Sequence, residues 1–215
     1  MFDENFILRI PAILLALTLH ECAHGLVALR FGDTTARDSG RLTLNPLAHL
    51  DIFGTIMLLV GPFGWAKPVP VNGYNFAHPK RDMVYVSLAG PVSNILSAIV
   101  SGYLLRAIDL FGPLSWHNPY LFGFFNLFIA INIGLAFFNL IPVPPLDGSN
   151  ILAGLLPNRL IPAYFNRMRY LPMIFMIMLV AEWGLHIPIF STLINPLYRP
   201  FASFWYYVIF WKTPL

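Results

Sequence analysis

Four long apolar segments limit the fold of this chain more than any other feature of its sequence. They cover approximately residues 6–29, 83–107, 121–142 and 171–189. Each is close to the length of about 20 residues that a helix needs to cross a bilayer. Charged residues make up only 11% of the 215 residues, whereas an ordinary soluble domain has about 25%. We therefore expect an all-α polytopic membrane protein that lies in a lipid bilayer.

The C-terminal segment leaves the number of transmembrane helices open. Residues 201–211 are apolar and aromatic but too few to cross a bilayer by themselves. They form either part of a last span over 190–211 or an anchor at the membrane surface. Together with the four long segments, this predicts about four to six transmembrane helices. We expect residues 1–215 to form a single domain, because no connecting segment is long enough to hold a second one.

Residues 52–64 are apolar but too few to form an ordinary span, and they contain Gly54, Gly61 and Pro62. If this segment crossed the membrane, the basic residues between the first two long segments would be divided between its two sides. If it enters the membrane and returns, all of them lie on one side, as the positive-inside rule favours. These residues are Arg30, Arg37, Arg41, Lys67, Lys80 and Arg81. The charges therefore predict a re-entrant segment.

Extended structure is expected after this segment. WAKPVPVNGY at 65–74 alternates valine with proline, a pattern typical of an edge strand or an extended loop. We therefore predict a short membrane-associated β/re-entrant region over approximately 34–80, after the first helix. In the resulting topology the N-terminus and residues 108–120 lie outside, whereas residues 30–82 and 143–170 lie inside.

Composition excludes several partners and sites. The net charge is +3, but the basic residues are spread among the loops between spans, so we expect no nucleic acid partner. Cys22 is the only cysteine in the sequence, which excludes an internal disulfide and a zinc site made of four cysteines.

The segment LTLHECAHGL at 17–26 places ionisable groups inside the first apolar segment. His20 and His24 are four residues apart, so on a helix both imidazoles project from one face and can bind one metal ion. Glu21 is turned by about 100° from His20 and can take a proton from a water molecule at that metal. The alternative is a pair of packing histidines. Ionisable groups in a span favour a functional role, because Asp, Lys or Arg at mid-membrane costs about 2.5–3.5 kcal/mol.

A catalytic zinc ion takes three protein ligands, so a third is needed. The candidates are the acids near the membrane and the remaining histidines, His49, His78, His117 and His186. The strongest partner segment is FFNLIPVPPLDGSN at 137–150, because its prolines end a helix and free backbone groups that must be buried or line a wet cavity. The histidines lie in the inner half of the first span, and Asp147 lies at the inner end of a later one. They meet only if an odd number of crossings separates these two spans. If 52–64 is re-entrant, the segment 83–107 is that single crossing.

HECAH in a first span and FNLIPVPPLDG after a later one together resemble the site-2 protease family of intramembrane zinc metalloproteases. RLTLNPLAHLDIFGT, GWAKPVPVN and AGPVSN are also similar to segments of its small prokaryotic members. No PDZ or nucleotide-sensing domain, which other members carry, is visible in residues 1–215.

The resemblance implies roles for particular residues. His20, His24 and Asp147 would be the ligands of one Zn²⁺ per chain, and Glu21 would be the catalytic acid and base. Asn139 would contact the substrate backbone or stabilise the oxyanion. The valine–proline segment would form an edge strand in the membrane that holds the substrate as an added strand.

Four further polar residues have two interpretations each. Asn132 and Asn94 either line the cavity or form hydrogen bonds between helices. His49 and Asp51 either orient a ligand histidine or belong to a polar loop near the inner surface.

The expected function is that of a zinc-dependent endopeptidase acting on peptide bonds in or near the transmembrane segments of membrane proteins. We expect a prokaryotic inner membrane, with the active site toward the cytoplasm. The alternatives are a membrane zinc-binding or transport protein and an inactive scaffold. Glu21 disfavours both, because a pure binding site does not need it. A homo-oligomer is compatible with the sequence, which does not identify the substrate.

Overall fold

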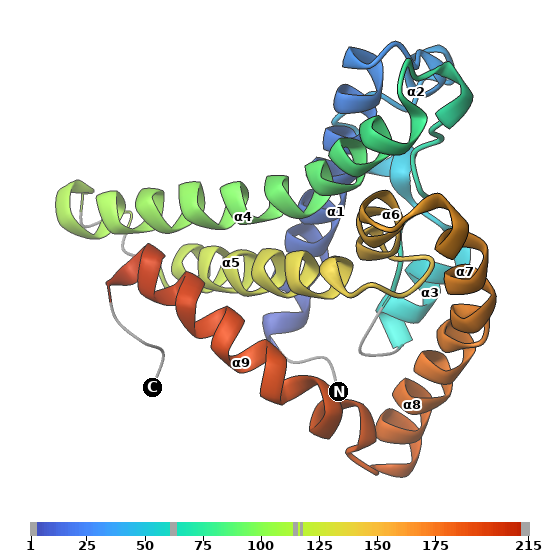
Figure 1. Cartoon of the computed structure of the whole chain (residues 1–215). Coiled ribbons are helices and arrows are strands. Elements are labelled where there is room, and N and C mark those ends of the chain that lie inside the picture. The colour runs from blue at the N-terminus through green and yellow to red at the C-terminus, as the bar shows by residue number, and fades with distance from the viewer. Residues whose placement is uncertain (1–3, 61–63, 114–115, 117, 212–215) are drawn as a thin grey trace.

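The computed structural model describes residues 4–60, 64–113, 116 and 118–211, most of which are helical. Figure 1 shows the helices in chain order. The α-helices are α1 (Glu4–Arg30), α2 (Thr35–Asp38), α3 (Ile52–Val60), α4 (Pro79–Phe111), α5 (Pro119–Leu140), α6 (Asp147–Leu155), α7 (Ile161–Met168), α8 (Leu171–Leu185) and α9 (Ile189–Phe210). Short 3-10 helices are η1 (Pro46–His49), η2 (Gly73–Asn75) and η4 (Asn158–Leu160).

Four helical segments in the described part of the chain are long and apolar enough to cross a membrane. They are Ile7–Arg30, Pro79–Phe111, Pro119–Leu140 and Asn158–Leu185. This confirms the prediction of an all-α membrane protein. Residues 190–211, which we expected to form a last span or a surface anchor, lie almost wholly in α9, and α9 is not one of these four segments.

Small residues let the central helices approach one another closely, as is common in membranes. Ala12 and Ala16 of α1 pack against Phe128 of α5. Figure 1 shows α4 and α5 side by side, with α9 crossing below them. A Cβ atom at Gly102 of α4 would lie 2.0 Å from Cγ2 of Ile209 in α9. The contact between α4 and α9 therefore requires a glycine at this position.

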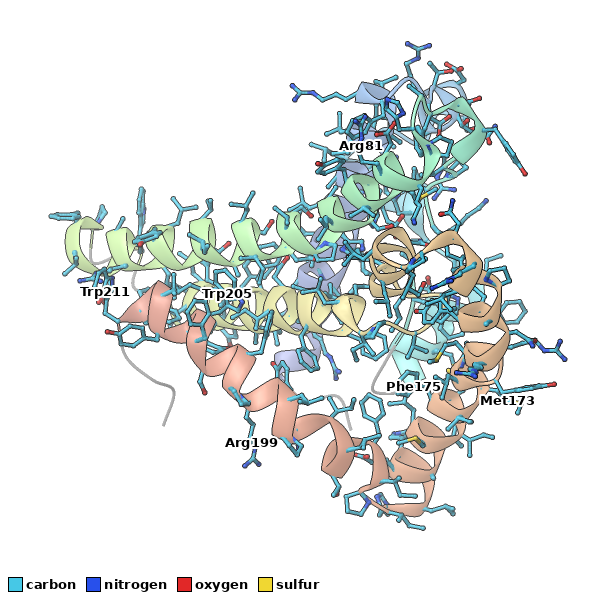
Figure 2. All side chains as sticks on the ribbon, in the orientation of Figure 1. Arg81, Met173, Phe175, Arg199, Trp205 and Trp211 are labelled. Atoms are coloured by element: carbon cyan, nitrogen blue, oxygen red, sulfur yellow. The ribbon has the colours of Figure 1, made fainter. Side chains whose placement is uncertain are left out.

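Helix α8 carries apolar side chains on its outer surface. Figure 2 shows Met173 on the outer side of α8, and its side chain is 58% exposed. Phe175 instead packs against Phe138 of α5 and Phe190 of α9. In the same view, Trp205 lies on the side of α9 that faces α5. Exposed apolar surface of this kind is suited to contact with lipid.

The predicted β/re-entrant region is not supported by the structure. The described residues between α1 and α4 form no strand and contain a single antiparallel bridge, between Leu50 and Ala66. Pro68 and Pro70 have no N–H group, so a regular ladder cannot continue from this bridge. Helix α3, with nine residues, lies where the re-entrant segment was expected. Positions 61–63, which follow it, lie outside the described residues. Residues 66–72 have no regular secondary structure apart from the bridge at Ala66, and we call them segment 66–72.

Candidate active site

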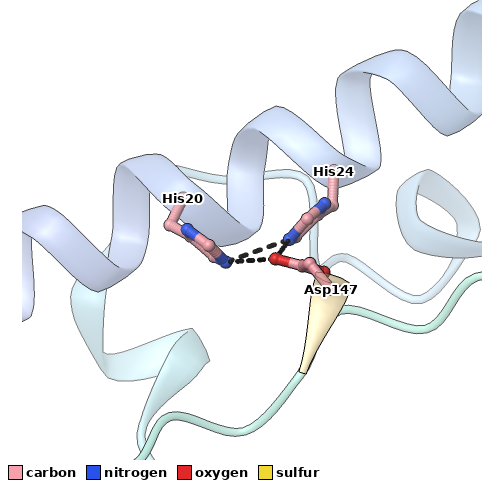
Figure 3. A group of neighbouring side chains, drawn as sticks. All are labelled: His20, His24 and Asp147. Atoms are coloured by element: carbon pink, nitrogen blue, oxygen red, sulfur yellow. Dashed lines mark hydrogen bonds and ion pairs between the residues drawn. The ribbon is translucent and has the colours of Figure 1, made fainter. Parts of the chain in front are cut away.

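Two histidines of α1 and one aspartate of α6 meet at a single point (Figure 3). Nε2 of His20 lies 3.0 Å from Nε2 of His24. Oδ2 of Asp147 lies 3.2 Å from the first nitrogen and 3.3 Å from the second. Both histidines are buried, and Asp147 is half-buried. Within the part of the chain that the structure describes, this is the only group of His, Cys, Asp and Glu side chains arranged to hold a metal ion.

The turn between α5 and α6 carries Asp147 back toward α1. Helix α5 ends at Leu140, and the prolines that follow it cannot continue a helix. At Gly148, a Cβ atom would lie 2.3 Å from the carbonyl oxygen of Leu140 and 2.5 Å from that of Ile141. Only glycine allows this approach, which folds the start of α6 against the end of α5. Tyr164 of α7 donates a hydrogen bond to the carbonyl oxygen of Pro142 and supports the turn.

Each imidazole is oriented by a hydrogen bond at Nδ1. Nδ1 of His24 lies 2.7 Å from the backbone carbonyl oxygen of Val86, which can only accept, so His24 donates. Nδ1 of His20 lies 2.6 Å from Oδ1 of Asn94. The amide nitrogen of Asn94 donates to Oδ1 of Asn132, so Oδ1 of Asn94 is also an acceptor. With Nδ1 protonated, each neutral ring has a lone pair on Nε2, as a metal ligand requires.

This arrangement fits a metal ion. Three acceptor atoms lie within 3.0–3.3 Å of one another, and such atoms repel unless a cation lies among them. Oδ2 of Asp147 is buried and has no hydrogen-bond donor among the described residues. In a tetrahedral zinc site with bonds of about 2.0–2.1 Å, the ligand atoms are about 3.3 Å apart. The observed triangle is close to that size.

Helix α4 forms the wall beside the two histidines. A Cβ atom at Gly90 would lie 2.5 Å from Nε2 of His24 and 2.6 Å from Nε2 of His20. The same helix packs closely on α6, because a Cβ atom at Gly154 would lie 2.0 Å from Cγ2 of Val84. A glycine at each contact therefore lets α4 hold α1 and α6 together.

The three residues line a cavity of about 330 Å³ that also includes Glu21 and Asn139. Oε2 of Glu21 accepts a hydrogen bond of 2.7 Å from the backbone N–H of Val69. The amide nitrogen of Asn139 donates to the carbonyl oxygen of Leu135, which leaves its second hydrogen free for another acceptor. All the residues of the predicted site therefore border one space.

The sequence interpretation missed several residues of this cavity. Asn150 lies three residues after Asp147 on α6, a spacing that places both on one helical face and was a usable signal. No local pattern indicated the residues of α4, whereas the valine–proline pattern and the prolines of 137–150 marked the other two segments. The remaining members reach the cavity from α4, from segment 66–72 and from the turn before α6. They are Pro68, Val69, Val71, Met83, Val86, Ser87 and Pro145.

The secondary candidates divide into two groups. Asn94 and Asn132 form the hydrogen-bonded chain behind His20. His49 instead contacts Cys22 and the carbonyl oxygen of Thr43, and Asp51 accepts from the backbone N–H of Gly54. Neither of these two contacts a histidine of the site, so orientation of a ligand histidine is wrong for both.

Two of the remaining histidines lie outside the cavity. His78 precedes α4, and His186 follows α8 in a left-handed backbone conformation. Neither lines the cavity. His117 is outside the described residues.

Comparisons with known proteins point to one family. The pattern of Peptidase family M50 matches residues 106–180. The chain is 42% identical over 177 residues to the putative zinc metalloprotease YwhC of Bacillus subtilis (strain 168), which covers 81% of each chain. It is 34% identical over 153 residues to the putative zinc metalloprotease Rip2 of Mycolicibacterium smegmatis, covering 68% of this chain and 56% of that protein. It is 31% identical over 147 residues to the putative zinc metalloprotease MJ0611 of Methanocaldococcus jannaschii, covering 68% of this chain and 70% of that protein. No solved structure matches.

Proposed function

This chain belongs to peptidase family M50 and is a metalloendopeptidase, and we propose that it uses zinc to hydrolyse peptide bonds in or near the transmembrane segments of membrane proteins. The observation that carries the proposal is the single cavity shared by Glu21 and the triangle of His20, His24 and Asp147. A carboxylate beside three metal ligands, and not one of them, is what a metal-assisted hydrolase requires.

His20, His24 and Asp147 would hold one zinc ion per chain. When bound, zinc supplies a Lewis acid that polarises a carbonyl group and acidifies water. Glu21 takes the proton from the attacking water and passes it to the leaving amine. Asn139 donates its free amide hydrogen to the carbonyl oxygen of the substrate, on which negative charge develops. Asn94 and Val86 keep both imidazoles in the protonation state that the ligands need.

The place of the cavity in the fold supports a substrate that lies in the membrane. His20 and His24 are inside the apolar helix Ile7–Arg30, so a peptide bond reaches them at membrane depth. A transmembrane helix has its carbonyl groups engaged in hydrogen bonds and must unwind locally before cleavage. Pro68, Val69 and Val71 of segment 66–72 also line the cavity, so the unwound part of a substrate would lie beside them.

The basic residues support an active site near the cytoplasmic surface of a prokaryotic inner membrane. His24 lies six residues before Arg30 at the end of α1, or about 9 Å along the helix. Arg37, Arg41 and Lys67 follow between α1 and α4. Loops rich in lysine and arginine remain in the cytoplasm.

Replacement of the general base tests the proposal. We expect Glu21→Gln to bind about one zinc ion per chain, as wild type does, and to cleave a transmembrane test substrate about 10²–10⁴-fold more slowly. Purified protein in detergent allows the zinc content and the cleavage rate to be measured on one sample. Asp147→Asn is the matched control, because it should lose zinc as well as activity. Cleavage by Glu21→Gln at the rate of wild type would contradict the mechanism. Zinc binding without cleavage by wild type would favour the metal-binding or scaffold alternatives.

A further inference from the structure

The side chain of Glu21 is held by a backbone group of a distant segment. Its Oε2 accepts the N–H of Val69 at 2.7 Å, a length typical of hydrogen bonds to ionised groups. The two residues are 48 positions apart in the chain. In the proposed function, on which this role rests, Glu21 is the general base, so the contact acts directly on the catalytic carboxylate.

The sequence of segment 66–72 leaves few N–H groups that could make this contact. Pro68 and Pro70 have none, and both prolines favour extended backbone in the residue before them. The N–H of Lys67 donates to the carbonyl oxygen of His49 at 2.8 Å. The N–H of Asn72 donates to Oδ2 of Asp33 at 2.7 Å. Between these two anchors only Val69 and Val71 keep an N–H group, and Val69 is the one that reaches Glu21.

Both ends of the segment are fixed by side chains outside it. Arg41 donates from Nη2 to the carbonyl oxygen of Lys67 at 2.7 Å. Asp33 is fully buried and accepts from Asn72 at one oxygen and from Thr35 and Asn75 at the other. With the segment tied at each end, Val69 cannot follow a movement of Glu21. The N–H group is therefore a fixed point for the carboxylate.

Without the hydrogen bond from Val69, the carboxylate of Glu21 could turn to a second position. Carboxylate oxygens are zinc ligands, and a catalytic site must keep one coordination position open. Glu21 directly follows His20 in α1 and lines the same cavity as all three proposed ligands. A carboxylate that turned toward them would fill the open position and no longer act as a base.

We propose that the backbone N–H of Val69 is a positioning group, which holds one oxygen of Glu21 away from the metal ligands and leaves the other oxygen for proton transfer. Segment 66–72 thereby sets the position of the general base through a peptide group. The side chain of Val69 has no part in this role. Arg41 and Asp33 act indirectly, because they hold the segment in place.

A change of the Val69 amide to an ester, by incorporation of the corresponding α-hydroxy acid, removes this one hydrogen and keeps the side chain. We expect kcat to fall about tenfold to a hundredfold, because a small misplacement of a catalytic group has an effect of this size. KM should stay within about twofold, and zinc binding should be unchanged or tighter. A purely structural role would instead weaken zinc binding. An ester at Ala77, which is exposed and whose N–H makes no hydrogen bond among the described residues, is the control for the chemistry of incorporation.

Hydrogen exchange tests the contact without any need for activity. In Glu21→Ala, the amide of Val69 loses its acceptor and should exchange at least about tenfold faster than in wild type. The amide of Asn72, which donates to Asp33, should exchange at the same rate in both proteins. Equal exchange at Val69 would overturn the inference, even if Glu21→Gln behaves as proposed above. An ester variant with the kcat of wild type, or with a higher one, would also overturn it.

Discussion

At the scale of single residues, the site depends on the absence of a side chain at Gly90. A Cβ atom here would lie 2.5–2.6 Å from the Nε2 atoms of His20 and His24, closer than nonbonded atoms approach. The rings cannot retreat without losing the hydrogen bonds of Nδ1 to Val86 and Asn94. Gly90 therefore keeps both the position and the protonation state of the two histidines.

We expect Gly90→Ala to weaken zinc binding at least about 100-fold, the upper range for changes around metal ligands. Competition with a chelator of known affinity measures this. Gly184→Ala is the control, because a Cβ atom at Gly184 meets nothing within 4 Å. If Gly90→Ala bound zinc as tightly as Gly184→Ala, the close contact between α4 and the histidines would be wrong.

At the scale of elements, α6 and segment 66–72 each carry one functional group to α1. The turn after α5 brings Asp147, and the anchored segment brings the N–H of Val69. Neither element is held in position by its local structure alone, because segment 66–72 lacks regular secondary structure and α6 has only nine residues. Packing of Gly148 and Gly154 holds α6, and the side chains of Asp33 and Arg41 hold the segment.

The anchor at Asp33 should make the segment sensitive to acid. Burial favours a higher pKa for Asp33, but hydrogen bonds from Thr35, Asn72 and Asn75 outweigh it and hold the pKa below its usual value. A carboxyl group with a lowered pKa stabilises the folded state above its unfolded pKa of about 3.9 and loses this effect as the pH falls through the folded value.

Asp33→Asn should lower the free energy of unfolding by about 1–3 kcal/mol at pH 7. The difference from wild type should be constant above about pH 5 and shrink below about pH 4. Denaturant unfolding in detergent at several pH values measures it. Asp38→Asn is the control, because Asp38 is exposed and, among the described residues, its side chain pairs only with the nearby Thr34 and Arg37. A constant difference down to the lowest pH would contradict the role of the Asp33 carboxylate.

At the scale of the whole molecule, the proposed zinc ligands join parts of the chain that are more than 120 residues apart. Helix α4 packs on both α1 and α6 and brings them together. A metal ion held by His20, His24 and Asp147 adds a direct link between the two helices. Its binding energy should therefore contribute to the stability of the folded protein.

We expect removal of zinc to lower the thermal unfolding temperature. With free zinc at about 100 times Kd, binding contributes about 2.7 kcal/mol, which chelation should abolish. Thermal unfolding of the purified protein with and without chelator provides the measurement. Asp147→Asn should unfold at the same temperature in both conditions. A wild-type protein that chelation left unchanged would show that these residues bind no metal in the folded state.

The sequence alone determined those features that depend on distances along one helix. The lengths of the apolar segments predicted the membrane helices, and the four-residue spacing of His20 and His24 placed both rings on one face of α1. The sequence also indicated Asp147, because prolines end the helix before it and a re-entrant 52–64 puts it on the same side of the membrane as the histidines. The roles of these residues stay predictions until the variants above are measured.

Only the tertiary structure decided which groups surround His20 and His24. The alternation of valine with proline predicts an edge strand or an extended loop at 65–74. The prolines have no N–H group, which prevents a ladder and leaves Val69 as the donor to Glu21. Gly90, Asn94 and Val86 reach the histidines from α4, some 60–75 positions away. Periodicity along a helix defines its faces, but the crossing of two helices depends on side-chain packing along their whole length. The partners of a face therefore follow from the fold of the entire chain.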